Sequence, residues 1–361
     1  MSLPKSLSES VARQLRVAVV GAGAFGRNHL RVYRALEKDG TDVALVAVAD
    51  ANADAARALA AEYEIAGFPS VDALLAAVAD GQLAIDAASL CVPTVHHTSV
   101  ALKLMAAGID VLIEKPIAAS LAEAESLLEA AESQGRIVQV GHLERFNPAV
   151  TAAIPLLNRP MFFESHRLSV FTPRSLDVDV VLDLMIHDLD VVLRMVDVPV
   201  SEVRAVGLPV LSKKIDIANV RLQFENGCVA NFTASRVSTE RVRKLRFFQP
   251  HQYVSLDFAR KDLLLIDVTA AASLTEAQLA AVLAQAAASG AGLEHPSAGL
   301  SLRKMPTVDG EPLRLELEAF LSAVRTRTAP PVTARHGTDA LALALEINRA
   351  ILEHGKRAGL M

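Results

Sequence analysis

Residues 16–38 read RVAVVGAGAFGRNHLRVYRALEK, and this stretch decides the fold of the first half of the chain. The apolar run over 17–20 predicts a strand, and the residues after the glycines predict a helix. Between them, Gly21, Gly23 and Gly26 form a G-x-G-x-x-G pattern. The first glycine permits a tight turn, the second lets the backbone approach a pyrophosphate, and the third lets helix pack on strand. The pattern predicts a dinucleotide site at the N-terminus of the helix.

The next apolar run, VALVAVAD over 43–50, predicts a second strand that ends at Asp50. An acid at this place accepts hydrogen bonds from the adenosine ribose hydroxyls of a dinucleotide. A 2′-phosphate would meet this carboxylate, and Ala51, Asn52 and Ala53 supply no arginine to compensate it. The predicted cofactor is NAD, with NADP less favoured. A glycine-rich turn in another α/β fold, with a surface aspartate, is the alternative.

Strands and helices alternate up to about residue 142. Continuous apolar runs predict parallel strands that are covered on both faces, and they lie at 85–93, 109–116 and 136–142. Helices are predicted over 51–65, 70–78, 97–108 and 120–135, with Ser70 and Ser120 as N-caps.

The second half follows a different pattern. Partial alternation of apolar and polar residues predicts strands over 161–171, 201–211, 215–224, 228–237, 244–250, 253–258 and 263–269. Helices are predicted over 180–196, 314–324 and 338–355. The economical arrangement is an antiparallel sheet with helices on one face. Residues near 268–310 are rich in Ala, Gly and Ser, and they predict an excursion outside the sheet.

Length and composition agree with two domains. At roughly 100–200 residues per domain, 361 residues predict a first domain over 1–140 and a second over 141–361, whose C-terminal helices are free to pack on the first. A net charge of −5 gives no reason to expect nucleic acid or an anionic membrane as a partner. Two cysteines exclude a disulfide framework and a four-thiolate zinc site. The first fifteen residues lack the apolar core of a signal peptide, so a cytoplasmic location is expected.

A charged pair stands at the end of the fourth predicted strand, in Glu114-Lys115-Pro116. Ligands of open parallel sheets bind beyond the carboxyl ends of the strands, so this pair is placed to act on one. A lysine there can hydrogen-bond a substrate hydroxyl and help to carry its proton. A solvated ion pair before a turn proline is the alternative.

The predicted helix over 180–196 carries Asp183, His187 and Asp190 at offsets of 0, 4 and 7, which is one helix face. An imidazole with a carboxylate one turn before it suits a general base that removes a hydroxyl proton. A purely structural histidine is one alternative, and an Asp-x-x-x-His half-site for a divalent metal is another. No further cluster of metal-ligand spacing accompanies the motif, so no metal is predicted.

Six features, in their order along the chain, resemble the Gfo/Idh/MocA oxidoreductases, the family of glucose–fructose oxidoreductase and inositol dehydrogenase. They are GAGAFGRNH at 21–29, Asp50, CVPTVHH at 91–97, IEKPIA at 113–118, VGHLERFNPA at 140–149 and DLMIHDLD at 183–190. The resemblance implies an N-terminal Rossmann domain and a C-terminal α+β domain with a large, mostly antiparallel open sheet. It also implies hydride transfer between a nicotinamide and a hydroxyl-bearing carbon, usually of a sugar or cyclitol.

By position, the resemblance assigns catalysis to Lys115 and His187, with Asp183 beside them. It also assigns Asp183 and His187 to substrate binding. The residues assigned to the cofactor are Gly21, Gly23, Ala24, Phe25, Gly26, Asp50, Val92, Pro93, Thr94, His97, Glu114 and Lys115. Arg145 and Asn147 fall near the substrate. The chain departs from many members on the substrate side, with Asp179-Val180 in place of a Gly-Gly pair and Met185 in place of a glycine.

The segments HLERFNPA and DLMIHDLD are most similar to the branch that acts on UDP-linked N-acetyl-hexosamines, as UDP-N-acetylglucosamine 3-dehydrogenases do. The expected reaction is NAD-dependent hydride removal from C3 of such a sugar. A dehydrogenase of myo-inositol or a free aldose is one alternative. A non-catalytic NAD(P)-binding regulator is another, which the presence of both Lys115 and His187 disfavours.

A UDP substrate needs cationic or backbone donors for its diphosphate. The candidates are Arg167, Arg174, Arg236, Arg241, Arg243, Lys244 and Arg246, each with a solvated sheet edge or interface as its alternative role. The partly apolar strands over 244–250 and 253–258 leave a sheet face that predicts a homodimer or homotetramer.

Overall fold

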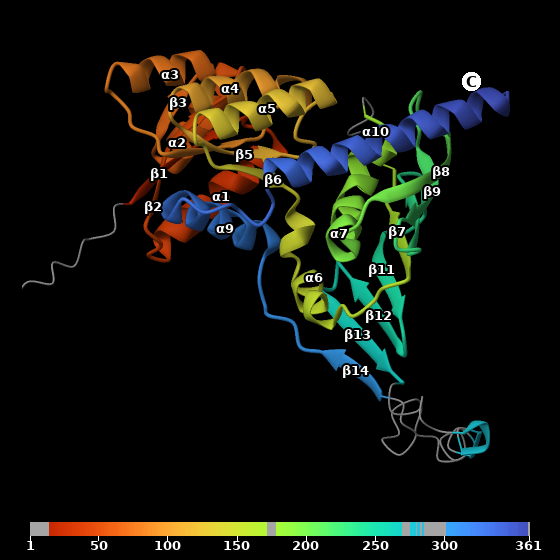
Figure 1. The fold of residues 1–361 in the computed structure, drawn as a ribbon. Helices are drawn as coiled ribbons and strands as arrows, with labels where there is room; N and C mark the ends of the chain where they lie inside the picture. Colours follow the sequence, from red (N-terminus) through yellow and green to blue (C-terminus); the bar gives the residue numbers. More distant parts are fainter. Residues whose placement is uncertain are drawn as a thin grey trace, which may run out of the picture. The chain divides into compact units, whose positions relative to one another are not determined.

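A computed structural model describes residues 14–171, 178–268, 275–278, 280–281, 284 and 301–359 (Figure 1). The chain forms two compact units. Unit 1 runs to Gly141 and takes back Leu317–Ala334, whereas unit 2 comprises His142–Glu316 and the chain from Arg335 onward. The main crossover therefore lies directly after the last strand of the first sheet.

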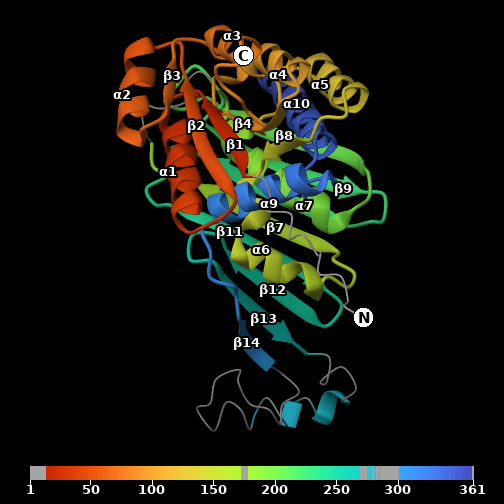
Figure 2. The same cartoon turned by 90° about the vertical axis from the view of Figure 1, so that its left-hand side faces the viewer.

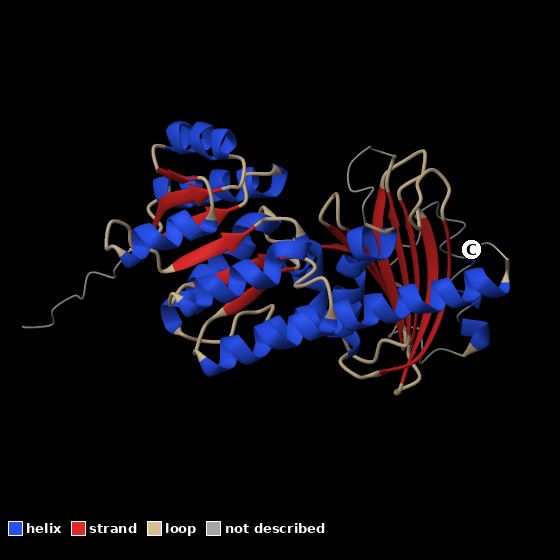
Figure 3. Ribbon diagram, turned by 90° about the horizontal axis from the view of Figure 1, so that it is seen from above, coloured by secondary structure: helices blue, strands red, loops and turns tan. Residues whose placement is uncertain are grey.

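Unit 1 is built on a six-stranded parallel sheet in the order β3-β2-β1-β4-β5-β6, with helices on both of its faces (Figure 3). Its strands are β1 (Leu15–Val20), β2 (Val43–Ala49), β3 (Ala66–Phe68), β4 (Ala87–Leu90), β5 (Asp110–Glu114) and β6 (Val138–Gly141). Its helices are α1 (Ala24–Lys38), α2 (Ala53–Tyr63), α3 (Val71–Ala79), α4 (His97–Ala106) and α5 (Leu121–Ser133). This strand order brings the ends of β1 and β4 together and confirms the predicted dinucleotide-binding fold.

Local sequence signals account for these elements. The Ser120 hydroxyl accepts a hydrogen bond from the Glu123 N–H, and the Glu123 carboxylate accepts one from the Ser120 N–H, which completes a capping box before α5. Ser70 caps α3 through its hydroxyl alone, which accepts a hydrogen bond from the Ala73 N–H. The short strand β3 was not predicted, because three residues are too few to show a period.

The C-terminal part of unit 1 comprises most of α9 (Pro312–Thr326) and the segment that follows it. It joins the sheet beside β6, where the Val140 N–H donates to the Val332 carbonyl. Arg327 bonds to the buried Asp110 at the start of β5 and to the Gly135 carbonyl. Residues more than 180 positions apart thus close the edge of the first sheet.

Unit 2 contains an eight-stranded sheet in the order β14-β13-β12-β11-β7-β10-β9-β8, in which β7 and β10 are parallel and all other neighbours antiparallel. Its strands are β7 (Phe162–Leu168), β8 (Val200–Leu208), β9 (Ile217–Phe224), β10 (Val229–Ser235), β11 (Val242–Gln249), β12 (Gln252–Asp257), β13 (Asp262–Asp267) and β14 (Ser301–Met305). The mostly antiparallel sheet confirms the predicted class of this domain.

One prediction for unit 2 is wrong in part. Residues near 268–310 were expected to lie outside the sheet, yet β14 pairs with β13 at its edge. An edge strand has one neighbour and tolerates charged residues such as Arg303 and Lys304, so it shows no apolar alternation. Most of 269–300 lies outside the described residues.

The helices of unit 2 cover one face of its sheet. Figure 2 shows α6 (Pro148–Ala153) and α7 (Ile186–Val196) on the same face of the strands. The long α10 (Ala334–Arg357) adds Ala340, Ala344, Ile347 and Ile351 to the same core. Three short 3₁₀ turns accompany these elements, η1 (Thr94–His96) in unit 1 and η2 (Leu143–Phe146) and η3 (Ile154–Leu156) in unit 2.

The helix predicted over 180–196 is two elements. A π-helical turn, η4 (Val181–Met185), comes first, and α7 follows it. Such turns are rare and frequently occur at functional sites. None of the helices in the described residues is both long and apolar enough to cross a membrane.

Candidate functional site

Each of the three glycines of the G-x-G-x-x-G motif is required for its own physical reason. Gly21 has a φ of +106°, and a Cβ on it would lie 2.6 Å from the carbonyl carbon and oxygen of Cys91. A Cβ on Gly26 would lie 1.8 Å from the Gly21 carbonyl oxygen. A Cβ on Gly23, in contrast, would meet no atom within 4 Å. The first and third glycines let turn, strand and helix close up, and the second leaves open space at the start of α1.

This open space fits a dinucleotide. Gly23 is the N-cap of α1 and has no side chain with which to bond the first backbone N–H groups of the helix. These groups and the positive end of the helix dipole suit a pyrophosphate. Ala24 and Phe25 are exposed at the same turn, Phe25 by 44%.

Asp50 lies beside the glycine turn. Its Oδ2 accepts a hydrogen bond from the Ala22 N–H at 2.5 Å, and its Oδ1 accepts one from the Asn52 N–H at 2.7 Å. The carboxylate is half-buried and is held between the ends of β1 and β2. The geometry brings together the motif and the acid that the sequence predicted to read the same dinucleotide.

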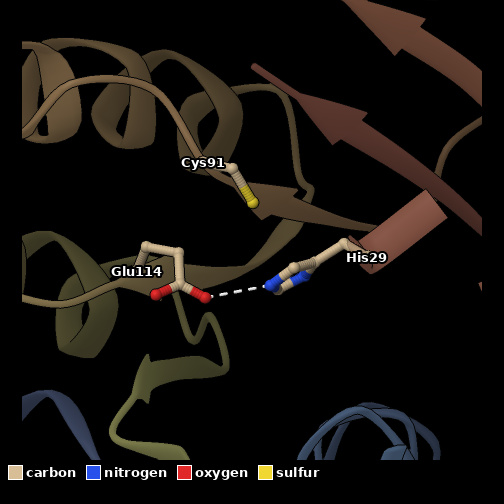
Figure 4. Close-up of side chains that lie close together, drawn as sticks. All are labelled: His29, Cys91 and Glu114. Atoms are coloured by element: carbon tan, nitrogen blue, oxygen red, sulfur yellow. Dashed lines mark hydrogen bonds and ion pairs between the residues drawn. The ribbon is translucent and has the colours of Figure 1, made fainter. Parts of the chain in front are cut away.

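Glu114 is paired with a residue that sequence reasoning missed. His29 Nε2 lies 2.9 Å from Glu114 Oε1, and both side chains are buried (Figure 4). A Cβ on Gly141 would lie 3.0 Å from the Glu114 carboxyl carbon, so the end of β6 leaves room for this carboxylate. His29 stands one helical turn after Gly26, inside the quoted GAGAFGRNH, and this position was its only sequence signal.

His97, predicted to bind the cofactor, lies against two backbone carbonyls. Its Nδ1 lies 2.9 Å from the Pro116 carbonyl oxygen and its Nε2 lies 2.9 Å from the Val92 carbonyl oxygen. The ring is fully buried, and burial lowers the pKa of His97. The neutral ring can donate to one of these two carbonyls and packs against the other, so His97 links the turn after β4 to the turn after β5.

These two contacts hold Lys115 from both sides along the chain. Glu114 before it is bound by His29, and Pro116 after it is bound by His97. Val92, Pro93 and Thr94 follow β4 at the same sheet edge, where they are half-buried or exposed. Ligands of parallel sheets bind at this edge.

Unit 2 supplies the second group of predicted residues. His187 lies in the first turn of α7 and Asp183 in the π-helical turn before it, and both are half-buried. The ring of His142 packs edge-on against that of His187, with centroids 6.4 Å apart. His142 is buried and was not predicted, because 45 residues separate it from its neighbour and no spacing rule connects them.

Arg167, predicted to contact substrate, bonds to two carboxylates of unit 2. Its Nε and Nη2 bond to the two carboxylate oxygens of Asp188 at 3.0 and 2.7 Å, and its Nη1 bonds to Glu144 Oε1 at 3.0 Å. Although burial acts to lower it, these carboxylates raise the pKa of Arg167 above its usual value. The side chain, 4% exposed, fastens the helix of His187 to β7.

Arg145 and Asn147 are also used inside unit 2. Arg145 forms a bidentate pair with Asp190 at 2.7 and 2.9 Å. Asn147 caps α6 and donates through Nδ2 to Glu144 and to the Phe258 carbonyl, both at 3.0 Å. Asp190, predicted to share a face with His187, is thereby fixed by Arg145. Arg145 thus braces α7 from η2, whereas Asn147 ties the start of α6 to η2 and to the turn after β12.

The diphosphate candidates divide into two groups. Arg236 is buried and bonds to Asp216 at 2.8 Å, and Arg246 lies 3.5 Å from Glu164. Lys244 is half-buried, whereas Arg241 and Arg243 are exposed at the start of β11. Although much of the Arg243 side chain is exposed, partial loss of water around its guanidinium and the charge of Arg167, which stands opposite on β7, lower the pKa of Arg243. Arg174 lies outside the described residues.

Comparison with known proteins gives consistent matches. A family model described as an oxidoreductase family with an NAD-binding Rossmann fold matches residues 15–142, and a GFO/IDH/MocA C-terminal domain matches residues 159–249. A UDP-N-acetylglucosamine 3-dehydrogenase from Acidithiobacillus ferrooxidans is 34% identical over 338 residues, which are 93% of this chain and 97% of that protein. An inositol 2-dehydrogenase from Acidothermus cellulolyticus is 30% identical over 202 residues, 54% of this chain and 57% of that protein.

The solved structures agree with this. A structure of UDP-N-acetylglucosamine 3-dehydrogenase from Acidithiobacillus ferrooxidans matches with a TM-score of 0.79 at 33% identity, over 93% of this chain and 97% of that one. A putative myo-inositol dehydrogenase from Sinorhizobium meliloti matches with a TM-score of 0.72 at 22% identity, over 94% and 98%. At that identity the second match shows the fold alone.

Proposed function

Because this chain belongs to the Gfo/Idh/MocA family of oxidoreductases, we propose that it removes a hydride from C3 of a UDP-N-acetyl-hexosamine and passes it to NAD⁺. The proposed substrate rests on the 34% identity to a UDP-N-acetylglucosamine 3-dehydrogenase, which extends over 93% of the chain. The 30% identity to an inositol dehydrogenase extends over only 54% of the chain. The presence of both Lys115 and His187 favours a catalytic role over a purely regulatory one.

The cofactor half of the proposal rests on unit 1. NAD⁺, when bound, supplies the ring that accepts the hydride. Gly21, Gly23 and the first turn of α1 hold its pyrophosphate, and Asp50 accepts hydrogen bonds from its adenosine ribose. Pro93 and Thr94 bind on the nicotinamide side, and His97 and Glu114 keep that edge in place.

The chemical half of the proposal rests on Lys115 and His187. As the hydride leaves C3, the hydroxyl on that carbon must lose its proton, and His187 accepts it. Asp183, four residues earlier, orients the imidazole. Lys115 hydrogen-bonds the same oxygen and stabilises its developing charge. In the alternative mechanism Lys115 is itself the base, and both residues are then still needed for turnover.

Turnover with different donors tests the substrate. We expect reduced nicotinamide to appear, measured by absorbance, when the protein is given NAD⁺ and UDP-N-acetylglucosamine. Neither myo-inositol nor free glucose should give a comparable rate at equal concentration. Faster turnover of myo-inositol would place the protein with the cyclitol dehydrogenases, and tight NAD⁺ binding with no turnover of any donor would indicate a regulator.

The choice of NAD over NADP can be reversed by two substitutions. Asp50→Ser together with Ala51→Arg removes a carboxylate that repels a 2′-phosphate and adds a guanidinium that pairs with it. Charged hydrogen bonds contribute about 1.5–3 kcal/mol, so each dissociation constant should move by roughly 10–100-fold, upward for NAD⁺ and downward for NADP⁺. The control is the same pair of changes four residues later, in the first turn of α2, namely Asp54→Ser with Ala55→Arg. An unchanged preference for NAD⁺ over NADP⁺ would show that Asp50 does not contact the adenosine ribose.

We further propose that the protein is a homodimer or homotetramer formed through the sheet of unit 2. Phe163 and Phe247 are buried in the core, so by strand alternation Phe162 and Phe248 lie on the opposite face. There Phe162 stacks on Phe248 at 5.5 Å, and Phe248 contacts Tyr253 at 5.0 Å. An apolar strip of this kind is stabilised when a second copy covers it.

Phe248→Asp should therefore shift the assembly toward the monomer, since it places a charge inside the strip. Light scattering of the unchanged protein at micromolar concentration should give a dimer or tetramer. Val308→Asp, which changes a side chain that is 78% exposed elsewhere in unit 2, should leave the mass unaltered. A monomeric unchanged protein would reject the assembly.

A further inference from the structure

Three metal-ligating side chains meet inside unit 1, from positions far apart in the sequence. They are His29 on α1, Cys91 after β4 and Glu114 at the end of β5 (Figure 4). One potential ligand atom from each lies within 4.8 Å of the other two. The sequence carries no sign of this cluster, because the spacings from 29 to 91 and from 91 to 114 match no metal motif.

We propose that His29, Cys91 and Glu114 form a binding site for a soft divalent cation of the Zn²⁺ type. A thiolate, an imidazole and a carboxylate are the three ligand types that zinc combines, and a water would complete a tetrahedron. With zinc–ligand bonds of about 2.0–2.3 Å, neighbouring ligand atoms stand about 3.3–3.7 Å apart. Side-chain rotations that move the ligand atoms by about 1 Å therefore bring the three residues to coordination distance.

The existing contact between two of the ligands suits this exchange. His29 Nε2 and Glu114 Oε1 are 2.9 Å apart and share one proton. The cation takes the place of that proton, which moves to His29 Nδ1. Nδ1 makes no hydrogen bond in the described part of the chain, so the change of tautomer breaks none there. The Cys91 thiol releases its proton to solvent as it binds.

Access and charge also fit. His29 and Glu114 are buried, but Cys91 is partly exposed and is the member that a cation reaches first. Together a thiolate and a carboxylate give two negative charges, which balance a divalent ion around a neutral imidazole. The site thus needs no further charged ligand.

Occupancy has a consequence for catalysis, and this second part rests on the proposed function. Glu114 directly precedes Lys115, and its contact with His29 anchors that end of β5. A cation that binds the carboxylate replaces this anchor and moves the backbone that carries Lys115. Zn²⁺ is therefore expected to act as a reversible inhibitor that a chelator relieves.

Cobalt titration of the full chain, stripped of metal with a chelator, tests the site without any turnover. One equivalent of Co²⁺ should bind with a thiolate-to-cobalt charge-transfer band in the near ultraviolet, and Zn²⁺ should abolish that band. Cys91→Ser should remove the band and weaken Zn²⁺ binding by about 100-fold or more. His29→Gln should weaken Zn²⁺ binding by a similar factor and provides the test if Cys91→Ser does not fold.

The second cysteine is the matched control. Burial raises the pKa of the Cys228 thiol to about 11, and this residue lies in the core of unit 2. Cys228→Ala should keep both the band and the affinity. Cobalt binding without a thiolate band, or a band that survives Cys91→Ser, would overturn the site. Inhibition by Zn²⁺ that is undiminished in Cys91→Ser would overturn the inhibitory mechanism, whereas a protein inactive on every sugar leaves the cobalt result standing.

Discussion

His187→Ala is expected to lower kcat by about 10²–10⁴-fold, the usual cost of removing a general base. The affinity for NAD⁺ should stay close to that of the unchanged protein, because His187 lies in unit 2 and the glycine turn and Asp50 lie in unit 1. Steady-state kinetics and a dinucleotide titration measure the two effects separately. His251→Asn, an exposed histidine in a turn of unit 2, should change neither quantity.

Lys115→Ala should give a loss of similar size, for a related reason. If both residues act on one hydroxyl proton, the double variant loses less than the product of the two single losses. The interaction between the two losses therefore tests whether they serve the same oxygen. Strict multiplicativity would show that they act at separate steps, and near-normal turnover in either single variant would remove that residue from the mechanism.

Arg167→Met is expected to lower the free energy of unfolding by about 3–5 kcal/mol. The substitution leaves Asp188 and Glu144 buried without the cation that each of them bonds. Removing one partner of a buried ion pair has this effect because the remaining charge cannot regain water. Urea unfolding followed by circular dichroism gives the change in stability.

A matched control and a kinetic readout separate this role from substrate binding. Arg204→Met breaks a pair with Glu202 that is largely exposed, and it should change stability little. Arg167→Lys keeps the charge but not the three-point fork, so its loss should lie between the two. If Arg167→Met instead raised KM and left stability unchanged, Arg167 would be a substrate residue as the sequence predicted.

The sequence predicted those features that depend on a few neighbouring residues. The three glycines, the acid after β2 and the serine caps each occupy one short stretch whose residue types leave few conformations. The parallel strands of unit 1 were also readable, because strands covered on both faces are apolar throughout. The edge strand β14 was not, since a charged strand with one neighbour carries no period.

The supporting residues of the site could not be predicted, and the reason is distance along the chain. His29 meets Glu114 across 85 positions, and Arg167 meets Asp188 across 21. An arginine in a strand looks the same in sequence whether it faces a substrate or a buried carboxylate. Only the fold shows that Arg145, Asn147 and Arg167 have partners inside unit 2.

If a hydride leaves C3 of a UDP-N-acetyl-hexosamine, an isotope placed on C3 must move with it to the nicotinamide. The protein is incubated with NAD⁺ and UDP-N-acetylglucosamine that carries deuterium at C3, and the reduced dinucleotide is examined by mass spectrometry. We predict that the dinucleotide gains one deuterium, whereas substrate labelled at C4 transfers none. Reduced dinucleotide without deuterium from the C3-labelled sugar, or with deuterium from the C4-labelled sugar, would contradict the account.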